Sequence, residues 1–216
     1  MNASGVRPVF TTTAFQANAE TEKMTQQTDE EADVDTTKLE EQVAALEGQV
    51  KLLQSKTAEN KVALIVFSGD LDKALAAFVI ATGAVAMGME CMMFFTFWGT
   101  PLLRDKSKKV GGKDTMSKMF GTMLPTGASE AKLSQMNMGG MGTSMMKALM
   151  KKKNVSSLEE FIALAEELEV KIYICEMSMD LMGFQREEMI EYKDLQFAGV
   201  ATFLAEAQNA KITLFI

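Results

Sequence analysis

The sequence of 216 residues contains no histidine, only two cysteines, three prolines and one tryptophan. Without histidine there is neither an imidazole base nor an imidazole metal ligand, which excludes the hydrolases and metal sites that depend on that side chain. Cys91 and Cys175 form no CxxC pair, so a zinc ribbon and a thioredoxin-type motif are also excluded. Sulfur is therefore the natural candidate for a reactive group, and a reducing cytoplasm is the predicted compartment.

Charge is unevenly distributed along the chain, whose formal net charge is -7. Residues 1–60 hold eleven acids and five bases, so most of the acidity belongs to the amino-terminal part. Residues 1–35 combine Thr, Gln and acids with few large apolar side chains, and we predict a disordered acidic tail there. A basic and then apolar signal peptide is absent from this stretch.

An amphipathic helix is predicted over residues 36–57. Its apolar side chains alternate spacings of four and three, which is the a/d seam of a coiled coil: Leu39, Val43, Leu46, Val50 and Leu53. Two interpretations remain open, a helix for self-association and a helix that docks on its own domain. The seam covers fewer than three heptads, which is short for an isolated coiled coil.

Strands and helices alternate over residues 61–216. Apolar strands are predicted at 61–67, 90–98, 171–175 and 212–216, with helices from about 71, at 157–168 and around 197–204. Such alternation is typical of right-handed crossovers and a mostly parallel sheet. We therefore predict an α/β domain with helices on both faces of the sheet, in a flavodoxin-like arrangement of three layers.

A long apolar stretch, residues 74–103, contains Glu90 as its only charge. A hydropathy window would mark it as membrane-spanning. Gly83 and Gly88 interrupt it, and Glu90 would lie at mid-membrane, where a carboxylate is costly. A helix followed by a central strand explains the same apolar total, so no stable membrane span is expected.

Residues 100–153 form a Met- and Lys-rich insertion that is too long for an ordinary connection. It holds eleven bases, three acids and nine methionines. Core filling is the most common role for methionine; a surface for partners and a thioether site for Cu(I) are the alternatives. The lysines could attract an acidic partner or an anionic substrate, whereas nucleic acid is disfavoured because no aromatic residues are interleaved with them. Gly139 and Gly140 indicate a hinge more than an anion site.

Cys175 ends a predicted buried strand, at the edge where open α/β sheets place their ligands. A helix beginning near Met177 would stabilise a thiolate through the backbone amides of Met177 and Ser178, whereas Glu176 and Asp180 would oppose it. The alternative is an inert buried cysteine, which position alone does not exclude. Cys91 opens an apolar strand, where a core role is favoured over a resolving thiol.

Four ordered segments resemble the DsrE/DsrF-like sulfur-relay family, in particular its methionine-rich branch, often labelled peroxiredoxin-like. These segments are 94–99, 132–140, 175–183 and 197–202. The resemblance covers about 61–216 and implies an α/β fold, oligomers and persulfide transfer on a cysteine that matches Cys175. Cys91 falls where relatives are expected to carry another residue, which argues against a two-thiol mechanism.

The resemblance implies a cytoplasmic sulfur carrier or sulfurtransferase that holds a persulfide on Cys175. The predicted supporting or pocket residues are Met177, Ser178, Asp180, Gly69, Trp98, Gly139 and Gly140. Sulfur donor and acceptor proteins and further copies of the chain are the expected partners, and no cofactor or metal is expected. The alternatives are a non-enzymatic oligomeric scaffold and a Cu(I)-binding or redox-sensing module. Peroxidase chemistry is poorly supported, with Arg186 the only arginine available to activate the thiol.

Overall fold

The computed structural model describes residues 36–53, 58–108, 110–111 and 115–216 of the chain. It divides into two compact units, Met1–Thr57 and Ala58–Ile216. In the first unit, residues 36–53 form one helix whose side chains are exposed along its whole length. The predicted tail over 1–35 and the last four residues of the predicted 36–57 helix lie outside the described residues.

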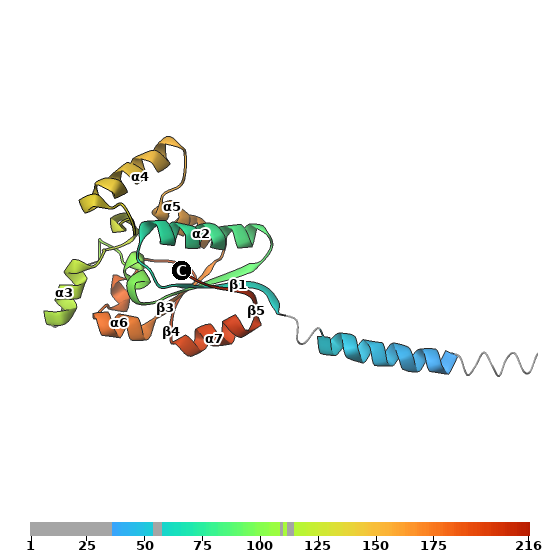
Figure 1. Ribbon diagram of the computed structural model, residues 1–216. Coiled ribbons are helices and arrows are strands. Elements are labelled where there is room, and N and C mark those ends of the chain that lie inside the picture. Colours follow the sequence, from blue (N-terminus) through green and yellow to red (C-terminus); the bar gives the residue numbers. More distant parts are fainter. Residues whose placement is uncertain (1–35, 54–57, 109, 112–114) are drawn as a thin grey trace, which may run out of the picture. The chain divides into compact units, whose positions relative to one another are not determined.

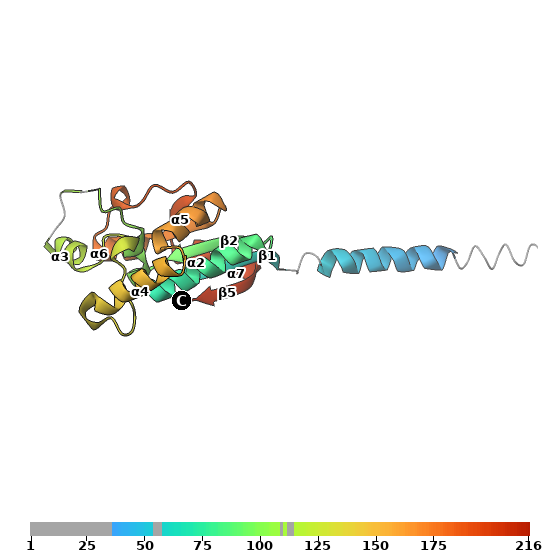
Figure 2. The same ribbon diagram turned by 90° about the horizontal axis from the view of Figure 1, so that it is seen from above.

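Five parallel strands form the sheet of the second unit, in the order β4-β3-β2-β1-β5 (Figures 1 and 2). Their bounds are β1 Glu59–Val66, β2 Glu90–Phe95, β3 Lys171–Cys175, β4 Leu195–Ala198 and β5 Ala210–Phe215. Because every pairing is parallel, the carboxyl ends of the strands meet at one edge of the sheet. The predicted α/β class with a parallel sheet is confirmed.

Helices cover both faces of this sheet, as predicted (Figure 1). One face carries α2 (Leu71–Ala86) and α5 (Leu158–Glu167), with a large core that includes Phe78, Phe95 and Leu158. The other face carries α7 (Val200–Asn209) over a smaller core. Successive residues of β3 alternate between the two cores, as a strand requires, so Ile174 faces the α2 side and Cys175 the α7 side.

Two of the predicted element boundaries were wrong. The strand predicted over 90–98 ends at Phe95, and Phe97–Leu103 forms the 3-10 helix η1, which contains Pro101. The helix predicted around 197–204 begins only at Val200, because Leu195–Ala198 pairs with β3 as an edge strand. Four residues offer too few alternations for a period of two to be recognised, so pairing with β3 decided their conformation.

The insertion contains two further α-helices, α3 (Thr115–Met123) and α4 (Met141–Lys152), and two 3-10 turns, η2 (Ala128–Glu130) and η3 (Met138–Gly140). A buried ion pair attaches it to the connection between β3 and β4, which holds a short helix α6 (Glu176–Met182) and the turn η4 (Arg186–Glu188). Arg104 Nη2 lies 3.2 Å from Glu188 Oε2, and Arg104 Nη1 donates to the carbonyls of Gly121 and Pro125. The guanidinium therefore links several segments of the insertion.

The methionines of the insertion are mostly on the surface, so the core-filling role favoured by the sequence was wrong. Eight of the nine are exposed: Met116, Met119, Met123, Met136, Met138, Met141, Met145 and Met146. Core filling is excluded for these residues, and the two alternatives, a surface for partners and a thioether site for Cu(I), remain.

The apolar stretch of residues 74–103 is divided among three elements. It includes all of α2 after its first three residues and the whole of β2 and η1, and Glu90 is exposed at the amino end of β2. Among the described residues, no helix has both the length and the apolar character that a membrane crossing requires.

Candidate functional site at the carboxyl edge of the sheet

The carboxyl ends of β1 and β2 approach each other closely at Gly69 and Trp98. A Cβ atom on Gly69 would lie 2.3 Å from the carbonyl oxygen of Trp98, and one on Gly99 would lie 2.3 Å from the carbonyl oxygen of Val66. Only glycine fits at such distances. The two predicted pocket residues, Gly69 and Trp98, are therefore neighbours in the fold.

Cys175 is the last residue of β3 and the N-cap residue of α6. An N-cap side chain lies where it can accept hydrogen bonds from the second and third amides of the helix, which here belong to Met177 and Ser178. The cysteine has the extended backbone conformation of an N-cap residue, with φ -67° and ψ 112°. In this structure no hydrogen bond joins the Cys175 side chain to these amides.

The Cys175 side chain is nevertheless only 2% exposed. It packs in the smaller core, whose buried members include Phe94, Ala198 and Phe203. Its strand partner Ala198 is also buried, whereas Gly199, which follows Ala198, and Met177 on the first turn of α6 are exposed. The sulfur is thus one layer below the surface.

Ser178 fixes the position of α6 and lines no open space, since it is completely buried. Its hydroxyl lies 2.9 Å from Thr96 Oγ1 and accepts a hydrogen bond of 3.0 Å from the backbone N–H of Phe97. These contacts tie the first turn of α6 to the segment after β2. Thr96 was missed by the sequence analysis, although a hydroxyl residue at the end of an apolar strand was the available signal.

Charged groups surround the first turn of α6. The Glu176 carboxylate pairs with Arg186, and the Arg186 guanidinium lies 4.7 Å from the centre of the Phe197 ring. The Glu176 carboxylate is thus paired with a cation in the folded protein. Asp180 is exposed on the same short helix.

An open cleft of about 800 Å³ lies beside Gly69 and Trp98. Its charged lining residues are Asp70, Lys73, Glu130 and Lys132. Lys73 pairs with Asp70 at 3.0 Å, and a hydrogen bond from Lys106, followed by one from the Thr126 amide, lowers the pKa of Glu130 to about 2. Cys175 is not among the lining residues of this cleft.

Gly139 and Gly140 lie in the lead-in to α4, away from this cleft's lining. Both have positive φ, 70° and 100°, in the region that favours glycine. They belong to the 3-10 turn η3 that leads into α4. Cys175, Met177, Ser178 and Asp180 thus lie at the start of α6, and Ser178 links this turn to Phe97, the residue before Trp98.

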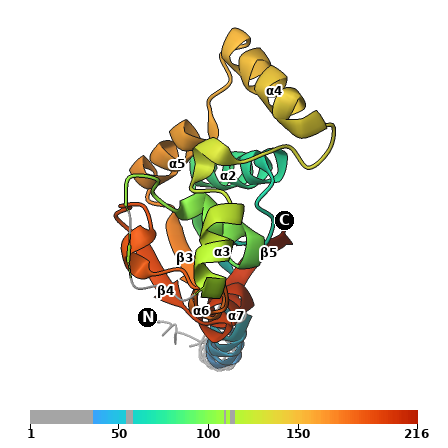
Figure 3. The same ribbon diagram turned by 90° about the vertical axis from the view of Figure 1, so that its left-hand side faces the viewer.

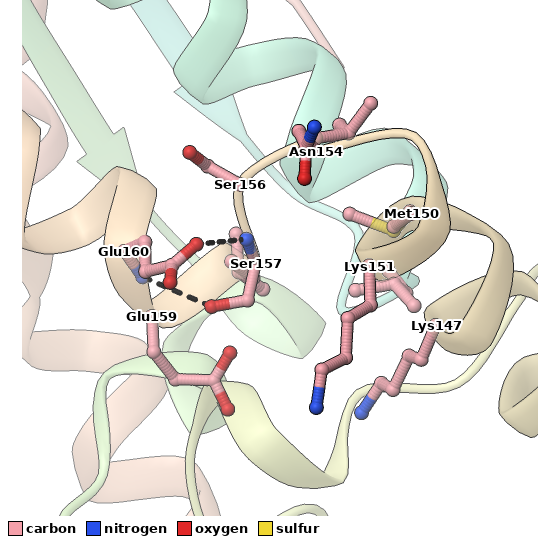
Figure 4. A pocket seen from close by; sticks show the side chains of 11 residues that line it. Lys147, Met150, Lys151, Asn154, Ser156, Ser157, Glu159 and Glu160 are labelled. Carbon is pink, nitrogen blue, oxygen red and sulfur yellow. Dashed lines mark hydrogen bonds between the residues drawn. The ribbon is translucent and has the colours of Figure 1, made fainter.

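A second hollow, of about 570 Å³, separates the end of α4 from the start of α5 (Figure 4). Its polar groups include a reciprocal cap, in which the Ser157 amide donates to Glu160 Oε2 at 2.7 Å and the Glu160 amide donates to Ser157 Oγ at 3.2 Å. None of the predicted site residues lines it.

Cys91 is buried at the amino end of β2, far along the strand from the carboxyl edge. Burial raises the pKa of its thiol to about 12. The predicted core role of Cys91 is confirmed. Among the described residues, no group of three or more Cys, Asp or Glu side chains is arranged to hold a metal ion.

Comparison with known proteins gives four findings. Residues 58–215 match the model of the DsrE/DsrF/DrsH-like family. The uncharacterized protein YrkE of Bacillus subtilis (strain 168) is 45% identical over 156 residues, which are 72% of this chain and 96% of YrkE. Sulfur carrier protein DsrE2 of Allochromatium vinosum is 37% identical over 162 residues, 73% of this chain and 99% of that protein. Among solved structures, the ychN protein from E. coli matches with a TM-score of 0.42 and 7% identity, covering 72% of this chain and 98% of that one.

Proposed function

The chain belongs to the DsrE/DsrF/DrsH-like family, and we propose that it is a sulfur carrier that holds a persulfide on Cys175. The observation that carries the proposal is the position of Cys175, at the carboxyl end of a central parallel strand and at the N-cap of α6. The 37% identity to a protein named as a sulfur carrier supports the same class of function.

The chemistry requires one thiolate and no oxidant. The Cys175 thiolate attacks the outer sulfur of a donor persulfide, the S–S bond of the donor breaks, and the donor leaves as a thiolate. In the second step an acceptor thiolate attacks the outer sulfur now on Cys175, which leaves as a thiolate in turn. This role would place the anionic sulfur at the N-cap of α6, beside the amides of Met177 and Ser178, although no hydrogen bond joins the Cys175 side chain to the helix amides in this structure.

Access to the sulfur requires a local opening, because Cys175 is buried. The first turns of α6 and α7 are the segments that must separate, since Cys175 pairs with Ala198 just before Gly199 and α7. Gly199 carries no side chain, and a Cβ placed there would meet no atom within 4 Å. Local openings of this kind cost less free energy than global unfolding of the protein.

The test is sulfur loading followed by intact mass spectrometry. Wild-type protein and Cys91→Ser are incubated with inorganic polysulfide and should each gain the mass of sulfur, whereas Cys175→Ser should gain none. Gain of sulfur by Cys175→Ser, or none by the wild type, would contradict the proposal. We also propose that the protein works in the cytoplasm with protein donors and acceptors of sulfur.

A non-enzymatic scaffold is the second candidate, and the burial of Cys175 favours it. In that case Cys175 remains unmodified in the native protein, and the exposed methionines serve only as a binding surface. The same loading experiment separates the two. The Cu(I) alternative is tested by titration against a competing chelator, because exposed thioethers are soft ligands.

A further inference from the structure

Helix α4 carries an apolar stripe on its outward face. Met141, Met145 and Leu149 are spaced by four residues and are 66%, 66% and 49% exposed. The opposite face is fixed to the rest of the insertion: Gly142 and Thr143 are buried, and Thr143 Oγ1 accepts a hydrogen bond of 3.0 Å from the Leu133 amide. Since these contacts set the rotation of the helix, the stripe faces away from the domain.

Figures 1 and 3 show α4 at the periphery of the domain, beyond α2 and α5 and away from the sheet. A helix in this position can lie against a flat surface without obstruction by the strands. An unpartnered apolar face on a protruding helix usually marks an interaction site.

The charge on α4 itself has a single sign, whereas Glu159 and Glu160 line the hollow that follows the helix. Residues 131–158 contain five lysines and no Asp or Glu: Lys132, Lys147, Lys151, Lys152 and Lys153. The whole chain has 22 bases and 29 acids, and residues 100–153 hold eleven of the bases but only three of the acids. The rest of the chain therefore holds eleven bases and 26 acids. An anionic surface would therefore attract the insertion and repel the remainder of the chain, which orients the molecule.

We propose that α4 is a membrane-docking helix that binds the surface of anionic lipid bilayers. The stripe enters the interface between headgroups and acyl chains, and the lysines contact lipid phosphates. Lysine favours a lipid surface over a protein partner here, because lysine is depleted in the cores of protein interfaces but extends readily toward headgroups. The proposal goes beyond sulfur transfer and does not depend on it.

The lysines at the end of α4 are the ones available for this contact. Lys147 Nζ donates to the carbonyl of Ser129 at 2.6 Å, which occupies its ammonium group within the protein. Lys151, Lys152 and Lys153 are exposed at the carboxyl end of the helix, and Lys151 borders the hollow before α5 (Figure 4). A phosphate beside these lysines would also meet the negative end of the helix dipole, which the lysines must outweigh.

The test is co-sedimentation of the full chain with phosphatidylcholine vesicles, with and without phosphatidylglycerol, at low and high salt. We expect binding only to the vesicles with phosphatidylglycerol, and weaker binding as salt rises. Changing Lys151, Lys152 and Lys153 together to Gln should weaken binding by about 100-fold. Met145→Glu, which places a carboxylate in the stripe, should weaken it by about tenfold or more.

Matched controls are Lys211→Gln, an exposed lysine on β5, and Met87→Glu, an exposed methionine at the end of α2. Both should bind as wild type, and far-UV circular dichroism verifies that each variant is folded. The proposal is overturned if wild-type protein ignores anionic vesicles, or if the α4 variants bind equally well. It is also overturned if Met145→Glu changes the sedimentation coefficient without vesicles, because a second copy would then occupy the stripe.

Discussion

Cys175 and Cys91 are both buried, yet they lie in different chemical environments. Burial is the one cause that shifts the pKa of the Cys91 thiol, raising it to about 12, which leaves a thiolate fraction of about 10⁻⁵ at neutral pH. Cys175 lies at the N-cap of α6, beneath two helix starts. The difference between the two residues can be measured in the native protein.

We expect native protein treated with an alkylating reagent to be modified at Cys175 well before Cys91. Peptide mass spectrometry after short exposures gives the two rates, and protein unfolded in guanidinium supplies the reference in which both react alike. Equal protection of both cysteines would favour the scaffold alternative.

Stability should fall at alkaline pH because of Cys91. The pKa of the Cys91 thiol is higher in the folded state than in the unfolded chain, so the unfolded chain releases this proton first. The free energy of unfolding therefore falls as pH rises from about 9 toward about 12. Burial likewise raises the pKa of Tyr192, whose hydroxyl donates to the carbonyl of Val170. Cys91→Ala should have a smaller loss of urea resistance between pH about 8 and about 10.5 than wild type. An identical pH slope in both proteins would refute the assignment to Cys91.

At the scale of elements, Ser178 connects α6 to the end of β2. Ser178→Ala removes the partner of Thr96 Oγ1 and of the Phe97 amide, in a site without solvent. We expect a loss of about 1–3 kcal/mol in the free energy of unfolding, from urea denaturation. Ser144→Ala, whose exposed hydroxyl donates only to the Gly140 carbonyl, should change it by less than about 0.5 kcal/mol.

The contact between the ends of β1 and β2 can be tested with two glycines. Gly69→Ala places a methyl group 2.3 Å from the Trp98 carbonyl oxygen, so the two segments must move apart and stability should fall. Gly83 lies inside α2, and a Cβ atom added there would meet no atom within 4 Å. Gly83→Ala should therefore raise the free energy of unfolding by about 0.5–1 kcal/mol. Thermal melts with Trp98 fluorescence would detect both changes. Equal changes in melting temperature for the two variants would mean that the close approach of Gly69 to Trp98 does not affect stability.

At the scale of the whole molecule, the helix over residues 36–53 predicts self-association. Its seam puts Val43 and Val50 at one heptad position and Leu39 and Leu46 at the other, the combination that favours two parallel strands. Sedimentation equilibrium of the full chain should give a concentration-dependent mass, because the seam is short. Leu46→Asn should lower that mass, whereas Glu41→Gln, outside the seam, should not. An unchanged mass in Leu46→Asn would reject the coiled coil.

The sequence alone determined the fold class, and it also led to the proposal that Cys175 is the reactive sulfur. Apolar runs at 61–67 and 171–175 are long enough to reveal strands, and Ser157 with Glu160 forms a reciprocal cap that marks the start of α5. The absence of histidine removed most competing chemistries without any coordinates. These features are local, since each depends on residues within a few positions of one another.

Tertiary structure decided what depends on distant residues. The conformation of 195–198 followed from an edge pairing with β3, and the exposure of the methionines followed from where the insertion packs. The burial of Cys175 likewise depends on Phe203, which is distant in the chain and arrives with α7. A sequence states which side chains are available, but only the assembled layers determine which of them water, lipid or another protein can reach.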